Sequence, residues 1–182
     1  RLTFRLDSYY NITIKTTGLL NWFVRQNCSR ATPYLLLVDD DVLLNIPSLM
    51  AIISNGTFRT DGIYGLFLQD IEPHPTGKWA VSLKDFPHRT YPDFIIGATT
   101  LYSSALIRPL IEELDRMVER NESIFFLDDV LFTGIIAQKL GFRRGPMPGI
   151  EVCSHTELLN RLVISECNSA RRIYVWSKFI LQ

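Results

Sequence analysis

The apolar positions of the chain fall into short runs and longer spaced stripes, which predict strands and helices in turn. Residues 2–6 alternate between apolar and polar, as in a strand with one buried face. Asp7 or Ser8 would then cap a helix that runs to about Gln26. The apolar side expected for this helix consists of Tyr10, Ile14, Leu19, Trp22 and Phe23.

The next segments predict two strands with a helix between them. Tyr34–Val38 is a continuous apolar run, typical of a strand covered on both faces, and it ends abruptly in the triplet Asp39–Asp41. Pro47 marks the start of a helix through Ser54. Gly62–Leu68 is expected to be another strand.

The second half begins with a long polar loop, Glu72–Tyr91, and continues with helices. A helix that begins at Ser103 or Ser104 is expected to run to about Asn121, another over Val130–Leu140 with Gly141 at its C-cap, and a last one around Arg171–Ile180. The apolar stripe expected for the helix over residues 103–121 is Leu106, Leu110, Leu114, Met117 and Val118. Alternating strands and helices predict an α/β sheet, in which ligands bind outside the carboxyl ends of the strands, where the triplet lies.

Composition narrows the class of protein. The chain has 182 residues, enough for one domain, with 47% apolar and 21% charged residues and a formal net charge of zero. Because Lys and Arg are scattered, a nucleic-acid surface is disfavoured and we expect no nucleic-acid partner. No apolar run approaches the roughly 18 to 20 residues that span a bilayer. The chain opens without Met, so we expect a longer protein.

Asparagine and cysteine usage points to a secretory compartment. Four of the eight asparagines begin N-glycosylation sequons, where chance predicts about one. These residues are Asn11, Asn27, Asn55 and Asn121. The three cysteines (Cys28, Cys153 and Cys167) fit one disulfide with one thiol left over, a partner in missing sequence, or buried thiols in a cytosolic protein.

The aspartate triplet is a candidate metal and nucleotide site. Three adjacent carboxylates repel one another unless a cation or hydrogen-bond donors compensate, and Mn²⁺ or Mg²⁺ prefers such oxygens. On an extended segment Asp39 and Asp41 would share one side, so that one could hold the metal and the other a ribose. Asp40 would point elsewhere. A solvated acidic turn is the alternative; a phosphatase nucleophile is disfavoured, because Val42–Leu44 lacks the expected Thr.

Asp128 and Asp129 precede the helix expected over Val130–Leu140, and carboxylates commonly cap the start of a helix. They are either a plain N-cap or a general base that takes a proton from a sugar hydroxyl. The second hypothesis expects the helix dipole to keep the carboxylate ionised.

Several motifs occur together, in a consistent order along nearly the whole chain. They are DSYYNITIKT (Asp7–Thr16) with the later Trp22 and Cys28, YLLLVDDDVLLN (Tyr34–Asn45), KWAVS (Lys78–Ser82), Tyr91-Pro92 with Gly97, and LDDV to Gly134 followed by Lys139-Leu140-Gly141. In this respect the chain resembles the β-1,3-galactosyltransferases and β-1,3-N-acetylglucosaminyltransferases of glycosyltransferase family 31.

The resemblance implies a GT-A-like, Rossmann-related α/β fold with a mixed sheet flanked by helices. It also implies that residues 1–182 are part of a catalytic domain whose first strand–helix unit lies upstream of Arg1. It further implies a UDP-sugar donor, Mn²⁺, a glycan acceptor on a glycoprotein or glycolipid, and inversion at the anomeric carbon. A type II anchor outside this chain would hold the lumenal domain at the Golgi membrane.

The same resemblance assigns roles to individual residues. The expected base is Asp129, with Asp128 beside it. The expected metal ligands are Asp41 and Asp39, and the expected donor contacts are Asp39, Asp40, Lys15, Trp79 and Gly97. His155, near the position of the family's late His, is either a substitute metal ligand or a lone surface histidine. Trp79 lines a pocket or belongs to the core.

Departures from the family pattern support a second hypothesis. Leu37-Val38 replaces the usual Lys-Thr, Gly97–Thr100 replaces a glycine-rich stretch, and Ile164 stands where the family has a late His. A catalytically degenerate member that binds glycans or a protein partner is therefore the main alternative. A cytosolic metal-dependent phosphohydrolase is the other.

Overall fold

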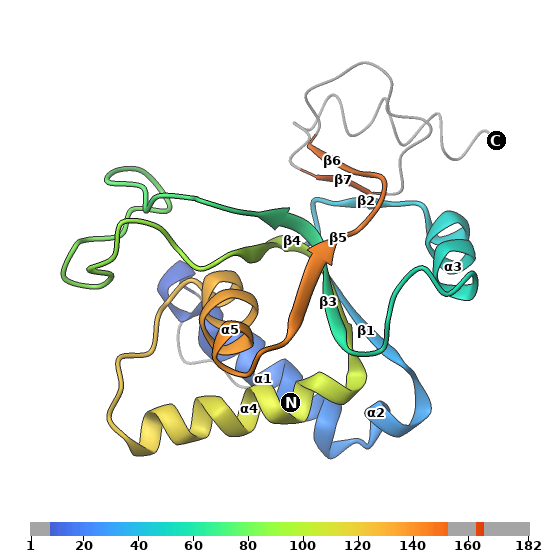
Figure 1. Cartoon of the computed structure of the whole chain (residues 1–182), viewed down its shortest axis with the longest axis horizontal. Helices are drawn as coiled ribbons and strands as arrows, with labels where there is room; N and C mark the ends of the chain where they lie inside the picture. Colours follow the sequence, from blue (N-terminus) through green and yellow to red (C-terminus); the bar gives the residue numbers. More distant parts are fainter. Residues whose placement is uncertain (1–7, 153–162, 166–182) are drawn as a thin grey trace.

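The computed structural model describes residues 8–152 and 163–165. Within these residues the main sheet has four strands in the order β1-β4-β3-β5 (Figure 1). They are β1 (Tyr34–Val38), β4 (Phe94–Ser103), β3 (Gly62–Leu68) and β5 (Arg143–Pro146). The sheet is mixed, because β4 runs antiparallel to β1 and β3 while β5 runs parallel to β3.

A second sheet of three short strands, in the order β2-β7-β6, lies at one end of the described fold (Figure 1). It comprises β2 (Leu43–Leu44), β7 (Val163–Ser165) and β6 (Ile150–Val152). β7 pairs antiparallel with β2 and parallel with β6, so it joins the segment after the aspartate triplet to the end of the described chain.

Helices cover both faces of the main sheet. The larger core lies between the sheet and a group of helices, and the smaller core packs against one helix on the other face. The helices of the larger core are α1 (Ile12–Arg25), α4 (Ser104–Glu119), the π-helix η2 (Val130–Ile136) and α5 (Ala137–Lys139), with a 3-10 turn η1 (Tyr9–Asn11) before α1 and a short α2 (Cys28–Ala31) after it. The smaller core involves α3 (Ile46–Ser54). The α/β class with a mixed sheet flanked by helices is therefore confirmed.

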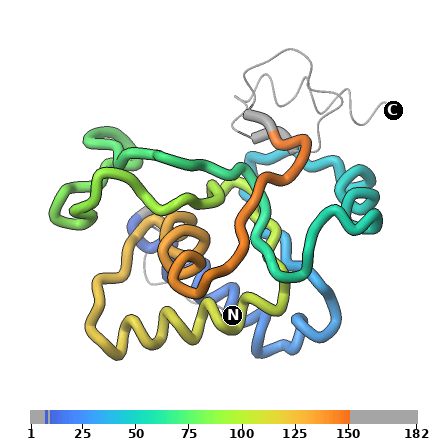
Figure 2. Tube along the Cα trace, in the orientation of Figure 1, coloured from blue at the N-terminus to red at the C-terminus, as the bar shows by residue number. Residues whose placement is uncertain are grey.

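Segments far apart in the sequence meet on the larger-core side. α1, at the start of the described chain, contacts the segment just before residues 130–139 (Figure 2). Thr13 of α1 joins these parts through its hydroxyl, which donates to the carbonyl oxygen of Phe126 at 2.8 Å. This contact places α1 against the segment that leads into η2.

Several predicted elements are confirmed with their bounds. β1, β3 and α3 occur where they were expected, and α4 begins at Ser104. Asn45 caps α3 by accepting a hydrogen bond from the Ser48 amide at 3.0 Å. The residues from Glu72 to Tyr91 form the expected long loop. The strand predicted at residues 2–6 and the helix around Arg171–Ile180 lie outside the described residues.

The predicted buried face of α1 is confirmed for Phe23 and was wrong for its other four residues. The structure buries Leu20, Phe23 and Val24, whereas four of the residues assigned to this face are exposed. The exposed residues are Tyr10, Ile14, Leu19 and Trp22. Apolar residues occur on both sides of this helix, and the buried side also carries Thr13, whose hydroxyl donates to carbonyl oxygens there. Val118 of α4 is likewise exposed, while Ile107 and Ile111 are buried.

Two strand assignments also need correction. β1 was expected to be covered on both faces, but it is a half-buried edge strand. Its apolar run is needed only for pairing with β4 and for partial contact with each core. Only helices were expected after the long loop, but β4, a strand of ten residues that contains Gly97, follows it.

The helix predicted over Val130–Leu140 is not a regular α-helix. Val130–Ile136 forms a π-helix, and α-helical geometry follows only over Ala137–Lys139. Gly141 follows with a φ of 68°, as the predicted C-cap requires. π-helical segments frequently mark functional sites.

No described helix is long and apolar enough to cross a membrane.

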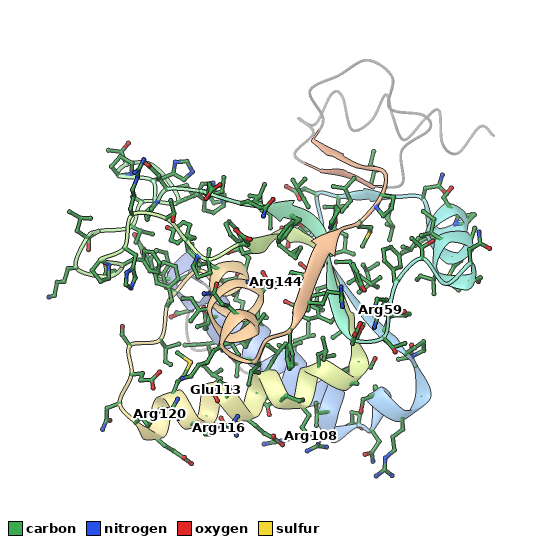
Figure 3. All side chains as sticks on the ribbon, viewed as in Figure 1. Arg59, Arg108, Glu113, Arg116, Arg120 and Arg144 are labelled. Carbon is green, nitrogen blue, oxygen red and sulfur yellow. The ribbon has the colours of Figure 1, made fainter. Side chains whose placement is uncertain are left out.

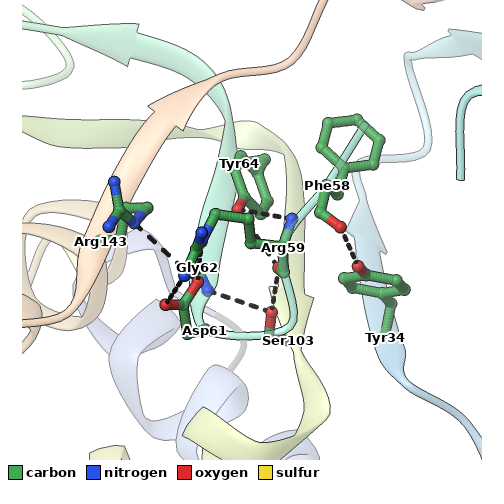
Figure 4. Close-up of polar contacts among 8 residues, drawn as sticks. All are labelled: Tyr34, Phe58, Arg59, Asp61, Gly62, Tyr64, Ser103 and Arg143. Atoms are coloured by element: carbon green, nitrogen blue, oxygen red, sulfur yellow. Dashed lines mark hydrogen bonds and ion pairs between the residues drawn. The ribbon is translucent and has the colours of Figure 1, made fainter. Parts of the chain in front are cut away.

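Polar contacts hold together the end of the sheet where β3 begins and β4 ends (Figure 4). The Ser103 hydroxyl donates to the Arg59 carbonyl oxygen at 3.1 Å and accepts from the Gly62 amide at 3.2 Å. The Tyr34 hydroxyl donates to the Phe58 carbonyl oxygen at 2.6 Å. These bonds fix the chain at the start of β1 and β3, at the opposite end of the strands from the aspartate triplet.

An ion-pair cluster around the buried Glu113 joins α4 to α5. Glu113 is 4% exposed and contacts three cationic side chains, Arg116, Arg120 and Lys139 (Figure 3). The Lys139 ammonium lies 2.7 Å from a Glu113 oxygen, and hydrogen bonds from the three cations lower the pKa of Glu113 to about 2.

Candidate active site

The aspartate triplet forms a turn at the end of β1. The Asp39 amide still pairs with the carbonyl oxygen of Ala98, which extends the β1–β4 ladder by one step. The chain then turns, and the Val42 amide donates to the Asp39 carbonyl oxygen at 3.4 Å. The expectation that strand alternation puts Asp39 and Asp41 on one side was wrong in its reason, because Asp40 and Asp41 lie in a turn.

Asp129 is held at the start of η2 by two backbone amides. One carboxylate oxygen accepts from the Gly97 amide of β4 at 3.2 Å, and the other accepts from the Val130 amide at 2.7 Å. Thr133, one turn later, donates its hydroxyl to the Asp129 carbonyl oxygen at 2.7 Å and accepts from the Ile95 amide at 2.8 Å. Asp129 is therefore fixed beside the middle of β4.

β4 pairs with β1 and also contacts Asp129. The triplet and Asp129 therefore lie beside neighbouring residues of β4. Ala98 pairs with Asp39, and Gly97 contacts Asp129. A methyl group added at Gly97 would meet the Asp129 side chain at 3.6 Å, which is an ordinary contact. The structure thus brings together carboxylates from two distant segments of the sequence.

Mutual repulsion among these carboxylates is visible in the pKa of Asp39. Although the side chain is solvent-exposed, partial desolvation raises its pKa, and the charges of Asp41, Asp128 and Asp40 raise it further. Lys78 acts in the opposite direction. The acidic groups of both segments and one cation of the long loop therefore share one electrostatic environment.

Burial shifts the two helix-start carboxylates in the same direction. Desolvation and the charge of Asp128 raise the pKa of Asp129 to about 6, despite the amide hydrogen bonds. Desolvation also raises the pKa of Asp128, while a hydrogen bond from Thr16 lowers it. The backbone amides at the start of η2 favour the ionised form, as expected, but burial and the charge of Asp128 outweigh them and leave the pKa above its ordinary value. At neutral pH the carboxylate is still mainly ionised.

The pKa values of two buried tyrosines near these carboxylates are also raised. Tyr91 is 6% exposed, and desolvation together with Asp129 raises the pKa of its hydroxyl to about 12. Desolvation raises the pKa of Tyr102 as well, with smaller contributions from Asp128 and Asp129. Both phenols remain protonated and can only be neutral neighbours of the carboxylates.

The long loop contributes Lys78 and Trp79. The Lys78 ammonium lies 4.1 Å from the centroid of the Trp79 ring, within range of a cation–π interaction. Trp79 is 39% exposed, so the alternative that it belongs to the core was wrong. Its proposed contact with a donor sugar stays a prediction.

Other predicted site residues differ in how far the structure locates them. Asp39, Asp41, Asp128, Asp129 and Gly97 converge at the edge formed by β1 and β4, as described above. Lys15 is half-buried on α1, and Asp40 is exposed in the turn. His155 lies outside the described residues. Ile164 of β7 pairs with Leu43, two residues beyond Asp41.

The donor atoms are compatible with a divalent cation only in part. Among residues 8–152 and 163–165, no group of three or more His, Cys, Asp or Glu is arranged to hold a metal ion. Asp39 and Asp41 nevertheless repel each other in the manner that a cation would relieve. Mg²⁺-type ions are often held by one or two carboxylates together with substrate phosphates. Two carboxylates therefore fit such an ion when a diphosphate completes the coordination.

Three of the four sequon asparagines are exposed at helix ends. Asn27 and Asn121 have φ values of 55°, and Asn55 follows the last residue of α3. Asn11 is half-buried in η1. Cys28 forms no disulfide with another described residue, and Cys153 and Cys167 lie outside these residues.

Sequence reasoning missed the role of Thr16. Its hydroxyl donates to Asp128 at 2.5 Å across a separation of 112 residues. The residue is part of the DSYYNITIKT motif, so its position was noticed, but nothing in the sequence identifies its partner. Lys78 was likewise quoted only as part of a motif.

The amino-acid sequence is similar to a family of known proteins. The sequence model of the family described as galactosyltransferase matches residues 3–148. β-1,3-Galactosyltransferase bre-5 of Caenorhabditis elegans is 32% identical over 136 residues, which cover 73% of this chain and 40% of that protein. The lactosylceramide 1,3-N-acetyl-β-D-glucosaminyltransferase of Xenopus tropicalis is 28% identical over 138 residues, with coverage of 74% and 35%.

Among solved structures, a glycosyltransferase involved in the glycosylation of the major capsid of PBCV-1 aligns with a TM-score of 0.49 and 9% identity. The alignment covers 97% of this chain and 81% of that chain. The chain spans 40% of the bre-5 sequence and 35% of the Xenopus sequence.

Proposed function

Because the chain belongs to the galactosyltransferase family, we propose that the full-length protein is a hexosyltransferase that forms β-1,3 linkages. The donor is a UDP-sugar that carries galactose or N-acetylglucosamine, and the acceptor is a glycan on a glycoprotein or glycolipid. The names of the two relatives support both sugars. The observation that carries the proposal is the position of Asp129 beside Gly97, one residue from the pairing partner of Asp39.

The reaction is a single displacement with inversion. Asp129 takes the proton of the acceptor hydroxyl, and the acceptor oxygen attacks the anomeric carbon of the donor. The bond between that carbon and the diphosphate oxygen breaks, and its electron pair leaves with UDP. A pKa of about 6 suits this role, because the carboxylate is ionised at neutral pH yet more basic than an ordinary aspartate.

Asp41 and Asp39 would hold Mn²⁺, which when bound stabilises the negative charge of the departing diphosphate. Asp39 would also contact the ribose. Lys15, Asp40, Trp79 and Gly97 are proposed to line the donor site, with Asp128 beside the base. This assignment uses the carboxylate repulsion at Asp39, which a cation would offset.

The test uses the full-length protein rather than this chain alone. Transfer of sugar from UDP-galactose and from UDP-N-acetylglucosamine to β-linked acceptor glycans is measured with Mn²⁺ and with a chelator. We expect a β-1,3-linked product with one of the donors and its loss with the chelator. Absence of transfer from both donors in the presence of Mn²⁺ would contradict the proposal.

A catalytically degenerate relative is the second candidate, and Ile164 at the late His position favours it. Calorimetry of the full-length protein with UDP, with and without Mn²⁺, separates the two. Metal-dependent UDP binding that weakens about tenfold or more in Asp41→Asn supports the enzyme. The exposed residue Asp115 provides the control variant Asp115→Asn.

The proposed location is the Golgi membrane, with the catalytic domain in the lumen and a type II anchor outside this chain. The exposed sequons at Asn27, Asn55 and Asn121 support a lumenal position, because glycans are added in the secretory pathway.

A further inference from the structure

One face of α1 makes polar contacts with the segment that leads into η2. Thr13 donates its hydroxyl to the carbonyl oxygens of Phe125 and Phe126, at 3.1 Å and 2.8 Å. Thr16, one turn later, donates to a carboxylate oxygen of Asp128 at 2.5 Å. Two hydroxyls of one helix therefore fix both the backbone before Asp128 and the Asp128 side chain.

The contact between Thr16 and Asp128 is a strong hydrogen bond. Its length of 2.5 Å lies in the range of hydroxyl–carboxylate bonds, which are shorter and stronger than neutral ones. It is part-buried, where such a bond is less weakened by competing water. Because a threonine hydroxyl donates readily to a carboxylate, the bond favours the ionised form of Asp128 and fixes its orientation.

Asp128 in turn acts on Asp129. The charge of Asp128 is one of the two causes that raise the pKa of Asp129, and burial is the other. Among the described residues, Asp39 at the end of β1, Tyr91 before β4 and Tyr102 within β4 also respond to one or both of these carboxylates. Neither tyrosine is ionised at neutral pH. The Thr16 hydroxyl donates to Asp128 and favours its ionised form, so Asp128 is the second anion beside Asp129.

We propose that Thr16 is a positioning residue of the transfer reaction: its hydrogen bond occupies Asp128 and leaves Asp129 as the carboxylate that meets the acceptor hydroxyl. This inference rests on the proposed function. Thr16 acts on the reaction only through Asp128, whose carboxylate it holds on the α1 side of the site while Gly97 and Val130 hold Asp129.

The experiment compares Thr16→Val with Thr16→Ser and Thr17→Val in the full-length enzyme. Thr17 is the matched control, because its hydroxyl donates to the Thr13 carbonyl oxygen within α1 at 2.7 Å. We expect kcat to fall about 10-fold or more in Thr16→Val, with the donor KM changed less than about twofold. The acid limb of the kcat/KM profile should move to lower pH, because without the bond Asp128 is protonated more readily and its charge then raises the pKa of Asp129 less. Thr16→Ser should restore both.

This inference alone is overturned by equal effects of Thr16→Val and Thr17→Val in an active enzyme, or by a loss confined to the donor KM. An unaltered titration of Asp128, followed by carbon NMR of the carboxyl group in Thr16→Val, also overturns it. If Thr16→Val does not fold, Thr16→Ala serves for the same measurements. Absence of transfer by the wild-type protein overturns the proposed function, and this inference with it.

Discussion

At the residue scale, the properties of Asp129 follow from three opposing effects. Burial and the neighbouring charge of Asp128 disfavour ionisation, and the amides of Gly97 and Val130 favour it. The first two effects dominate, so the pKa is raised to about 6. A carboxylate of this kind is costly to the fold at neutral pH and is suited to accept a proton.

This balance predicts a pH dependence of stability. A raised carboxyl pKa means that the folded state binds its proton more tightly than the unfolded state, so the stabilisation is present at low pH and is lost as the pH rises through about 6. We expect the free energy of unfolding to fall by about 1 to 3 kcal/mol between pH 5 and pH 7 from this residue. Chelator-treated protein, unfolded in urea at each pH, gives the measurement.

The control is Asp129→Asn, which removes the titrating group. Its stability should depend less on pH over this range, with the remaining slope due to Asp39 and Asp128, whose pKa values are also raised. An equal slope in wild type and variant would be inconsistent with the raised pKa of Asp129.

At the scale of the elements, local signals predict what a segment forms better than where it packs. The bounds of β1, β3 and α3 follow from apolar runs and helix caps, and the structure confirms them. The edge position of β1 depends on its pairing with β4, which no local pattern reveals. The buried face of α1 depends on contacts with carbonyl groups more than 110 residues away, at Phe125 and Phe126.

The candidate site shows the same limit. The sequence indicated Asp39, Asp41, Asp128 and Asp129 because runs of carboxylates at element ends are conspicuous. It could not indicate Thr16, because a threonine inside a helix has no local sign of a partner 112 residues later. The π-helical geometry after Asp129 was also unpredictable, since Val130–Ile136 has the apolar spacing of any buried helix.

Close packing between β3 and β4 predicts an intolerance to larger side chains at Gly65. A methyl group there would lie 2.2 Å from the Ile95 side chain and 2.6 Å from the Thr99 carbonyl oxygen, at the irregular point in the pairing of the two strands. We expect Gly65→Ala to destabilise the fold by about 1 to 3 kcal/mol. Urea unfolding measures this effect.

Gly97→Ala is the matched variant, since its methyl group would make only ordinary contacts with Asp129, the nearest at 3.6 Å. We expect it to change stability by less than about 1 kcal/mol. Similar losses in the two variants would mean that strand propensity, rather than the close approach at Gly65, determines the outcome.

The Glu113 cluster predicts a structural link between α4 and α5. Glu113→Gln leaves Arg116, Arg120 and Lys139 without their shared anion, so we expect the melting temperature to fall by several degrees at pH 7. Because the pKa of Glu113 is lowered to about 2, this contribution is present above its ordinary pKa and disappears as the pH falls toward 2.

Glu112→Gln is the control, because Glu112 is exposed on the same helix. Its melting temperature should stay within about one degree of the wild type. If Glu113→Gln behaved in the same way, the cluster would contribute nothing measurable to the fold.

At the scale of the whole molecule, the chain matches only part of the length of its relatives in the family. It belongs to the galactosyltransferases, and it spans 40% of the length of bre-5. Within that part, residues of α1, β1, β4 and η2 meet at one edge of the sheet, so the candidate site depends on the tertiary fold rather than on any single motif.

The proposed lumenal location predicts glycans on the exposed sequons. When the full-length protein is expressed in animal cells, we expect Asn27, Asn55 and Asn121 to be occupied more fully than Asn11, which is half-buried in η1. Mass spectrometry of glycopeptides gives the occupancy. Unmodified asparagines at all four positions would favour a cytosolic protein.

The most direct test of the account is the transfer rate of Asp129→Asn in the full-length enzyme, at saturating donor and acceptor and neutral pH, with Asp115→Asn as the control. We predict that kcat falls about 10²- to 10⁴-fold while the affinity for UDP with Mn²⁺ stays within about threefold of the wild type. Unchanged transfer by Asp129→Asn would contradict the claim that this carboxylate removes the acceptor proton.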